Sequence, residues 1–459
     1  MNVKQEFDYR KGIVLEPDAK DFPLLDKTPF LEEGTDPIDP SRYYTPEFMA
    51  LEWDRMWTRI WNFAGLVSDI PDVGDFFTYD LGPESFLIVR SGEDTIQAFY
   101  NVCQHRGRRL VDDDYGSVGD SFTCLFHAWK YGIDGSLKHV ADRETFRPEA
   151  LCGDLNLKSV RCDTENGMIF LSMDPAAPPL KEALGVIPEH FAPYDISKMR
   201  VVKEVSAEWP VNWKTAADVF YEAYHVLAVH PEITGAMDDY NIQVDLYDKG
   251  MCRFGVAFGR ISPHLKDQDT MNDDLKGMLK VAGLEDTFTG GPADVRLALA
   301  NAMRSIFEAK GYDCSTYHDS QLVDSWNYGV FPNVQIGIYP EGALVQRWRP
   351  HPTDPEKCYF DVINLVHPEL AGLSPRDAYL DWRTDIDLDN YVRPPRQVLR
   401  TLEEQREGLG LVGYQDYENI IKVQPGMRSR GLQGMPLSEQ EIRIRHYNTE
   451  IDRYLSVAE

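Results

Sequence analysis

The spacing of apolar side chains divides the chain into a helical start, a strand-rich stretch and a longer mixed stretch. Residues 44–62 place Tyr, Phe, Leu, Met and Trp side chains at helical spacing, which predicts a helix with one strongly apolar face. From about residue 63 to 175, short alternating runs are separated by turn residues such as Ser91-Gly92 and Asp134-Gly135. Such runs predict short strands, so we expect this stretch to form a small all-β domain.

The mixed stretch follows a proline-rich linker, Pro175-Ala-Ala-Pro-Pro179. Strands are predicted at 334–339, 344–348 and 359–364, and helices at about 212–229, 272–283, 293–310, 375–407, 414–423 and 438–455. Residues 265–325 are polar and helix-prone between strand-like pieces, which indicates an insertion. The expected organisation is therefore a small β domain (63–175) and an α+β domain (176–459), with an N-terminal leader and helix (1–62) packed on the latter.

Composition and charge exclude several classes of protein. The 459 residues are 43% hydrophobic and can bury a large core, but no stretch approaches about 18 uninterrupted apolar residues, so no membrane span is expected. The formal net charge of −28 argues against nucleic acid as a partner, and it reflects either solubility or docking of a partner with a basic face. Seven irregularly spaced cysteines and the lack of an apolar signal segment indicate a reducing, cytoplasmic setting.

Two short motifs each pair one thiol with one imidazole: Cys103-Gln-His105 and Cys124-Leu-Phe-His127. Such a set fits either a structural zinc site or a [2Fe–2S] cluster in which cysteines hold one iron and histidines hold the other. The flanking residues favour the cluster. Gly107 and Gly132 permit close backbone approach to an inorganic core, and Tyr131 offers a hydroxyl that can tune it.

A second constellation lies in the predicted helix at 212–229. Glu222 and His225 are three residues apart and share a helix face, but His225 and His230 lie about 140° apart round an ideal helix. They can meet one ion only where the helix distorts or ends, and Pro231 disfavours helical backbone at His230. Two histidines and a later carboxylate would form the facial triad of a non-haem Fe(II) site. Taken alone, the segment fits equally an amphipathic helix with two hydrogen-bonded histidines.

Both motifs resemble those of the Rieske non-haem iron aromatic ring-hydroxylating oxygenases, in the large (α) subunit. The family's cluster loops read C-x-H-R-G and C-P-Y-H-G-W, and this chain departs at Leu125, Phe126 and Ala128, none of them a ligand position. The resemblance spans nearly the whole chain and is weakest over 265–325. It implies a helix-grip catalytic domain, in which a curved antiparallel sheet surrounds a long helix. It also implies that a Rieske [2Fe–2S] cluster is held by Cys103, His105, Cys124 and His127.

The resemblance continues through Asn212-Trp213-Lys214 and Glu222-Ala-Tyr-His225 to His230. It implies that His225 and His230 bind a mononuclear Fe(II). Glu222 matches the acid that bridges the two metal sites across a subunit boundary, between His127 of one subunit and His225 of its neighbour. The third iron ligand matches Asp416 in Gly413-Tyr-Gln-Asp416. Its competitors lie in a run that is also typical of a solvated helix face: Asp381, Asp385, Asp387 and Asp389.

The resemblance implies an oxygenase component that uses O₂ and electrons from NAD(P)H, delivered by a ferredoxin, a reductase or both. The expected reaction is cis-dihydroxylation of an apolar aromatic or polycyclic compound. The same metals would also serve a monooxygenase or an O- or N-demethylase. A homotrimer is expected, with or without a small β subunit (α3β3). Two other classes compete: a Rieske ferredoxin, for which a far shorter chain would suffice, and a zinc-stabilised binding protein.

Overall fold

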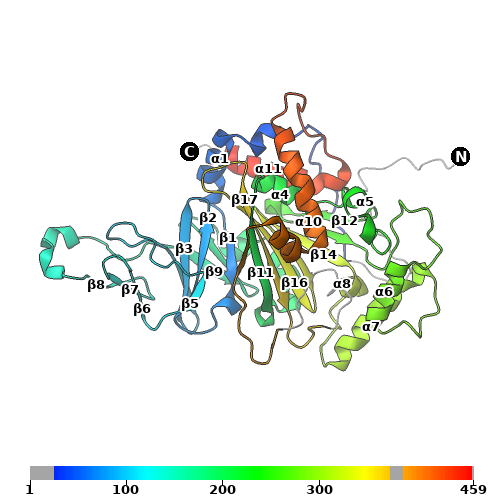
Figure 1. Cartoon of the computed structure of the whole chain (residues 1–459), viewed down its shortest axis with the longest axis horizontal. Helices are drawn as coiled ribbons and strands as arrows, with labels where there is room; N and C mark the ends of the chain where they lie inside the picture. Colours follow the sequence, from blue (N-terminus) through cyan, green and yellow to red (C-terminus); the bar gives the residue numbers. More distant parts are fainter. Residues whose placement is uncertain (1–24, 373–385, 457–459) are drawn as a thin grey trace.

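Two neighbouring sheet regions and a group of helices form the part of the chain that the computed structural model describes, residues 25–372 and 386–456. In Figure 1 the smaller sheet region, in blue and cyan, stands beside a larger sheet in green and yellow. We refer to residues 62–172 as the small domain and to the described residues from 180 onward as the large domain. The predicted combination of a small all-β domain and a helix-grip domain is confirmed.

The small domain contains a seven-stranded antiparallel sheet and a three-stranded one. The first has the order β1 (Asn62–Leu66), β10 (Met168–Ser172), β9 (Ser159–Glu165), β4 (Thr95–Tyr100), β3 (Glu84–Gly92), β2 (Asp75–Leu81) and β5 (Tyr115–Ser117). The second consists of β6 (Ser121–Thr123), β7 (Lys130–Gly132) and β8 (Leu137–His139). The Cys103 motif follows β4 and the Cys124 motif joins β6 to β7, so two loops present the predicted cluster ligands.

Strand β3 explains how the small domain is anchored. Its central residues form an unbroken apolar run, as expected for a strand that is covered on both faces. Phe86 and Ile88 point into a core shared with the large domain. Leu87 and Val89 point into a separate core that also contains Cys103 and Cys124. One strand therefore connects the base of the cluster loops to the main core.

The large domain is built on an eight-stranded sheet. Its order is β12 (Gln243–Leu246), β13 (Cys252–Val256), β14 (Ser325–Val330), β15 (Val334–Tyr339), β16 (Gly342–Pro350), β17 (Cys358–Val366), β11 (Arg200–Trp209) and β18 (Gln397–Leu399). Every neighbouring pair is antiparallel except β11 and β18. The predicted strands at 334–339, 344–348 and 359–364 lie within β15, β16 and β17.

The predicted helices at 272–283, 293–310 and 438–455 are present, the one at 414–423 is part of a longer helix, and those at 44–62 and 212–229 are shorter or interrupted. The helices of the described residues are α1 (Pro46–Glu52), α2 (Leu180–Ala183), α3 (Ile187–Phe191), α4 (Trp213–Asp218), α5 (Val226–Val229), α6 (Asp273–Val281), α7 (Val295–Ala309), α8 (Asp319–Val323), α10 (Leu402–Met427) and α11 (Ile442–Ser456). The predicted helix at 375–407 is wrong for residues 386–401, which contain β18 and no helix. Residues 373–385 of that prediction lie outside the described residues.

The remaining segments pack on the large domain. Thr28 donates its backbone N–H to Asp245 of β12 at 2.7 Å, and Arg42 pairs with Asp452 of α11 at 2.6 Å. Helices α6 and α7, within residues 265–325, share a small apolar core of their own that includes Leu275 and Leu299. Among the described residues, no helix combines the length and apolar character needed to cross a membrane.

Candidate metal centres

The two cluster loops of the small domain fold alike. In the first loop Cys103 donates its N–H to the Arg108 carbonyl at 2.8 Å and accepts from Gly107 N–H at 3.0 Å. In the second, Cys124 donates to the Trp129 carbonyl at 2.8 Å and accepts from Ala128 N–H at 2.9 Å. The residue four positions after each cysteine has a positive φ, +74° at Gly107 and +55° at Ala128. The two loops thus have the same turn around each cysteine.

The side chains of these loops fit an iron–sulfur cluster. Cys103 and Cys124 are each 2% exposed, and the His105 and His127 rings lie 4.6 Å apart between centroids. Nδ1 of His105 is buried and has no hydrogen-bond partner, as expected for a nitrogen that binds a metal. The Tyr131 hydroxyl lies 3.5 Å from the Cys103 sulfur. Soft thiolates on one side and imidazoles on the other form the donor set of a Rieske cluster.

The predicted helix at 212–229 is interrupted where the candidate iron-binding motif lies. Asn212 caps α4 by accepting the Lys214 N–H at 2.9 Å, and α4 already ends at Asp218. A non-helical stretch leads to α5, which ends at Val229. Pro231 follows, and His230 accordingly has non-helical backbone angles, φ −125° and ψ 51°. The distortion expected from the five-residue spacing of the histidines is therefore present.

His225, His230 and Asp416 come together, with one ligand atom from each lying within 4.8 Å of the others. Nε2 of His230 lies 2.9 Å and Nε2 of His225 lies 3.4 Å from Oδ1 of Asp416 on α10. Asp416 is 2% exposed. Burial lowers the pKa of His225, but hydrogen bonds that its ring donates to Asp416 and Glu222 outweigh this and raise the pKa to about 10. Two imidazoles and one carboxylate form the donor set of a facial triad with open positions.

The Nδ1 atoms of His225 and His230, on the side of each ring away from Asp416, also have hydrogen-bond partners. Oε1 of Glu222 lies 2.6 Å from Nδ1 of His225, and Oε1 of Gln415 lies 2.7 Å from Nδ1 of His230. Because an amide oxygen only accepts, it fixes the proton of His230 on Nδ1 and leaves Nε2 free for a metal. Sequence reasoning missed Gln415 as an orienting residue, although it directly precedes Asp416.

Among the described residues, the acids Asp387 and Asp389 are not part of the candidate triad. Asp387 and Asp389 are exposed in a turn, and Asp381 and Asp385 lie outside the described residues. Asp218, an acid close to the motif, accepts a hydrogen bond from the Tyr447 hydroxyl at 3.2 Å. Burial raises the pKa of Asp218 to about 7. The hydrogen bond from Tyr447 connects Asp218 to α11.

The candidate iron-binding segment, residues 212–230, packs against one side of the large sheet. Phe220 lies 5.5 Å from Trp348 of β16 and 5.3 Å from Phe360 of β17, measured between ring centroids. A Cβ built on Gly329 of β14 would lie 3.1 Å from the ring of Tyr221. Trp348, Phe360 and Gly329 therefore face the segment, and alternation along each strand identifies the other residues that do so.

That side of the sheet carries Asn327, Gly337, Leu344 and Val362, which we call the sheet floor. Asn327 pairs with Gly337, and Gly337 pairs with Leu344, across β14, β15 and β16. Asn327, Leu344 and Val362 are partly exposed although they lie on inner strands. These three side chains are therefore not fully covered by the elements that pack on the sheet. Leu344 and Val362 contribute apolar side chains to this floor, and Asn327 contributes an amide.

Comparisons with known families agree with this geometry. The family of the ring-hydroxylating α subunit (catalytic domain) matches residues 196–457, and the Rieske [2Fe–2S] domain family matches residues 60–156. The first match covers more than half of the chain, so the chain belongs to the family of ring-hydroxylating oxygenase α subunits. Members of this family carry a Rieske [2Fe–2S] cluster and a mononuclear iron and receive electrons from a reductase. The match decides for the cluster and against zinc at the two loops.

Individual relatives include two kinds of oxygenase. The chain is 29% identical over 400 residues to the glycine betaine monooxygenase oxygenase subunit of Chromohalobacter salexigens, covering 83% of this chain and 81% of the relative. It is 30% identical over 422 residues to the biphenyl 2,3-dioxygenase α subunit of Rhodococcus jostii, covering 89% and 82%. A crystal structure of a quaternary ammonium Rieske monooxygenase has the same fold, with a TM-score of 0.63 at 16% identity, covering 94% and 99%.

Proposed function

We propose that this chain is the oxygenase component of a system that cis-dihydroxylates an apolar aromatic or polycyclic compound with O₂. Electrons would come from NAD(P)H through a ferredoxin or reductase. The observation that carries the proposal is the group of His225, His230 and Asp416, on elements that pack over the sheet floor, where Leu344 and Val362 are partly exposed.

The residues divide the work between two sites. In this proposal, Nε2 of His225, Nε2 of His230 and the Asp416 carboxylate bind the mononuclear iron. Four ligands from the small domain bind the cluster: Cys103, His105, Cys124 and His127. When bound, the iron supplies a site for O₂ activation and the cluster supplies single electrons. Glu222 and Gln415 hold the proton-bearing nitrogens of the two histidines and so fix the ring orientations.

The sheet floor supports an apolar ring as substrate. Leu344 and Val362 offer hydrocarbon surface, while the Asn327 amide covers Gly337, where an added Cβ would lie 2.8 Å from Oδ1 of Asn327. Asn327 supplies a single amide that can orient a polar substituent or product hydroxyl. An apolar pocket with few polar groups is the usual arrangement for a small apolar ligand.

Monooxygenation, including N-demethylation, is the second candidate. It is favoured by the similarity to the glycine betaine monooxygenase subunit, which extends over 83% of this chain. The metal ligands would be the same in both reactions. The two candidates differ in the substrate that the sheet floor accepts, a flat apolar ring or a small cation.

A trimer would bring the two kinds of site together across a subunit boundary. Leu125 and Phe126, which precede His127, are 77% and 53% exposed. Tyr224 and Leu227, which flank His225, are 60% and 40% exposed. Association that covers both patches would place His127 of one subunit close to Glu222 of the next, and Glu222 could then hydrogen-bond to both imidazoles. A small β subunit is compatible with this arrangement.

Product identification tests the reaction. The holoenzyme, with a surrogate ferredoxin and reductase, would be supplied with NADH and O₂ and with biphenyl, naphthalene, glycine betaine or carnitine. A cis-dihydrodiol formed with stoichiometric O₂ uptake supports the first candidate, and a demethylated amine supports the second. The variant Asp416→Ala should lose mononuclear iron and turnover but keep the visible spectrum of the cluster. Retained turnover in that variant would refute the assigned triad.

The bridging role of Glu222 needs its own variant. Glu222→Gln should keep both metals, because the amide still accepts from the His225 imidazole, yet lose most turnover. Iron analysis and the rate at which O₂ and substrate reoxidise a pre-reduced cluster separate these effects. If the cluster of Glu222→Gln is reoxidised at the wild-type rate, Glu222 does not bridge the two sites.

A further inference from the structure

A buried carboxylate on β17 holds two arginines of the neighbouring strand. Oδ2 of Asp361 lies 2.9 Å from Nε of Arg347 and 2.7 Å from Nε of Arg349, both on β16. Ser206 donates a further hydrogen bond to Oδ1 at 2.6 Å. Asp361 has no exposed surface, so both guanidinium groups are fixed by an acceptor that water does not reach. Their remaining N–H groups can then bond elsewhere.

A second buried carboxylate, Glu204 of β11, holds another pair. Oε2 lies 2.6 Å from Nη2 of Arg393, and Oε1 lies 2.8 Å from Nε of Arg396. The Tyr115 hydroxyl also donates to Oε2 at 2.9 Å. Tyr115 belongs to the small domain, so this site already lies at the boundary between the domains. We call Asp361, Glu204 and their four arginines the arginine clamp.

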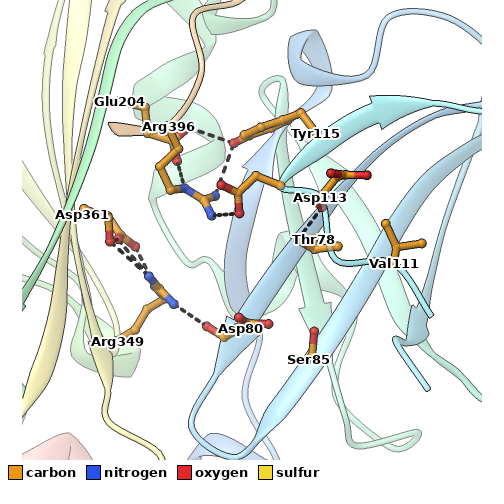
Figure 2. Close-up of polar contacts among 12 residues, drawn as sticks. Thr78, Asp80, Ser85, Val111, Asp113, Tyr115, Glu204, Arg349, Asp361 and Arg396 are labelled. Carbon is orange, nitrogen blue, oxygen red and sulfur yellow. Dashed lines mark hydrogen bonds and ion pairs between the residues drawn. The ribbon is translucent and has the colours of Figure 1, made fainter. Parts of the chain in front are cut away.

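All four arginines of the clamp reach from the large domain into the small one. Nη1 of Arg347 donates to the Ala64 carbonyl at 2.8 Å, and Nη1 of Arg349 donates to the Asp80 carbonyl at 2.8 Å. Nε of Arg393 lies 2.5 Å from Asp69, and Nη1 of Arg396 lies 3.0 Å from Asp114. Figure 2 shows Arg349 between Asp361 and Asp80, and Arg396 beside Glu204 and Tyr115.

The contacts of the clamp lie on the chain that carries the cluster loops. The Asp80 carboxylate pairs with Arg109 at 3.1 Å, and Arg109 forms a β-bridge with Val102, next to Cys103. Residues 109–123 join the first loop to the second, and the clamp holds this connection at Asp114 and Tyr115. Thr78 of β2 adds a hydrogen bond to the Asp113 carbonyl at 3.1 Å (Figure 2).

We propose that the arginine clamp positions the cluster: it fixes the small domain at one angle on the large domain and thereby sets where the cluster lies in the trimer. This inference rests on the proposed electron transfer between subunits. Buried ion pairs add little stability relative to apolar packing, but their hydrogen bonds are directional and permit one orientation. Because electron transfer falls steeply with distance, a domain that rocked on an apolar contact would deliver electrons at variable rates. The clamp residues are positioning residues and touch neither metal.

The proposal predicts a change in distance distribution rather than in the cluster itself. Reduced Rieske clusters are paramagnetic, so pulsed dipolar EPR on the dithionite-reduced holoenzyme reports the distances between clusters of one trimer. Arg349→Met and Arg396→Met should broaden this distribution at least two-fold, while the cluster g values and midpoint potential stay those of the wild type. Arg396→Lys, which keeps a charge near Glu204 and Asp114, should recover part of the narrow distribution.

Arg304→Met is the matched control, because Arg304 pairs with Asp319 at 2.6 Å within the 265–325 region and away from the domain boundary. Its distribution should match the wild type. Narrow wild-type distances in both folded clamp variants would overturn the proposal. If the wild type shows no dipolar signal between clusters, the proposal that the chain forms a trimer is wrong. In that case a nitroxide label is attached at Lys276→Cys in a Cys152→Ser background, and the distance from label to cluster within one chain is measured. The clamp variants must broaden the distribution of this distance.

Discussion

Ala128 adopts a left-handed backbone conformation at the point where the first cluster loop uses a glycine. Its φ is +55°, and Gly107 at the matching position of the first loop has φ +74°. The Cβ of a non-glycine residue in this region costs about 1–2 kcal/mol. The family pattern also has glycine here, so the departure noted in the sequence has a definite energetic consequence.

Replacing Ala128 by glycine should therefore stabilise the protein. We expect Ala128→Gly to raise the free energy of unfolding by about 1 kcal/mol, measured by denaturant titration of the holoenzyme. The control is Ala302→Gly in α7, where helical backbone suits alanine and the change should cost about 1 kcal/mol. If Ala128→Gly is instead less stable than the wild type, the added entropy of the unfolded glycine chain outweighs the relief of backbone strain.

At the scale of elements, local patterns predicted several strands and helices correctly and missed others, such as β11. Alternating Val and Ile residues correctly placed β15, and the proline after His230 correctly marked the end of a helix. The helix prediction was wrong for residues 386–401 because the conformation of this stretch depends on contacts with distant residues. Arg393 and Arg396 bond to Glu204, far earlier in the chain. Helical propensity cannot outweigh such contacts, and Pro394-Pro395 lack the N–H groups a helix needs.

The metal motifs were predictable for a related reason. Each loop holds its cysteine and histidine within four residues, so the donor set is visible locally, whereas Asp416 required the family resemblance. The structure brings Asp416 to His225 and His230, but the ligand roles stay predictions. Gln415 and the arginine clamp escaped notice because amides and arginines are common on surfaces. Only the fold shows which of them are buried.

The sheet floor yields a prediction for the strands beneath the substrate. Leu344→Phe would fill part of the accessible space over β15 and β16, so large rings should be affected before small ones. We expect kcat/KM for phenanthrene to fall about ten-fold relative to naphthalene. Leu402→Phe, at a 58% exposed position at the start of α10, is the control. Equal effects on both rings would place the substrate elsewhere.

On the scale of the whole molecule, the clamp makes the association of the two domains sensitive to acid. Burial raises the pKa of Glu204, but Arg396 and Arg393 outweigh burial and lower it to about 2 from the usual 4.5. Because the folded pKa lies below the unfolded one, this carboxylate stabilises the fold above pH 4.5, and its contribution is lost as the pH falls toward 2. Relative to the protonated acid, ionisation of Glu204 at neutral pH contributes about 3 kcal/mol to the free energy of unfolding.

Thermal unfolding from pH 7 to pH 3 tests this link. The wild type should unfold at a higher temperature than Glu204→Gln at neutral pH, and the gap should narrow progressively below pH 4.5. Asp361, whose pKa Arg349 and Arg347 also lower against the effect of burial, should add to the slope in both proteins. A gap that stays constant with pH would mean that Glu204 acts by packing rather than by charge.

Assembly is the largest scale at which the surface makes a prediction. Leu125 is 77% exposed near His127, a proposed cluster ligand, and so exposed an apolar side chain is uncommon beside such a site. If a neighbouring subunit covers it, Leu125→Asp buries a charge without a partner, and the trimer should weaken by at least ten-fold in dissociation constant. Sedimentation velocity measures the change. Val281→Asp on α6, 55% exposed and remote from both metal sites in sequence, should leave the trimer intact. Equal sedimentation of the two variants would remove Leu125 from the subunit contact, and the route from His127 to Glu222 would then need another surface.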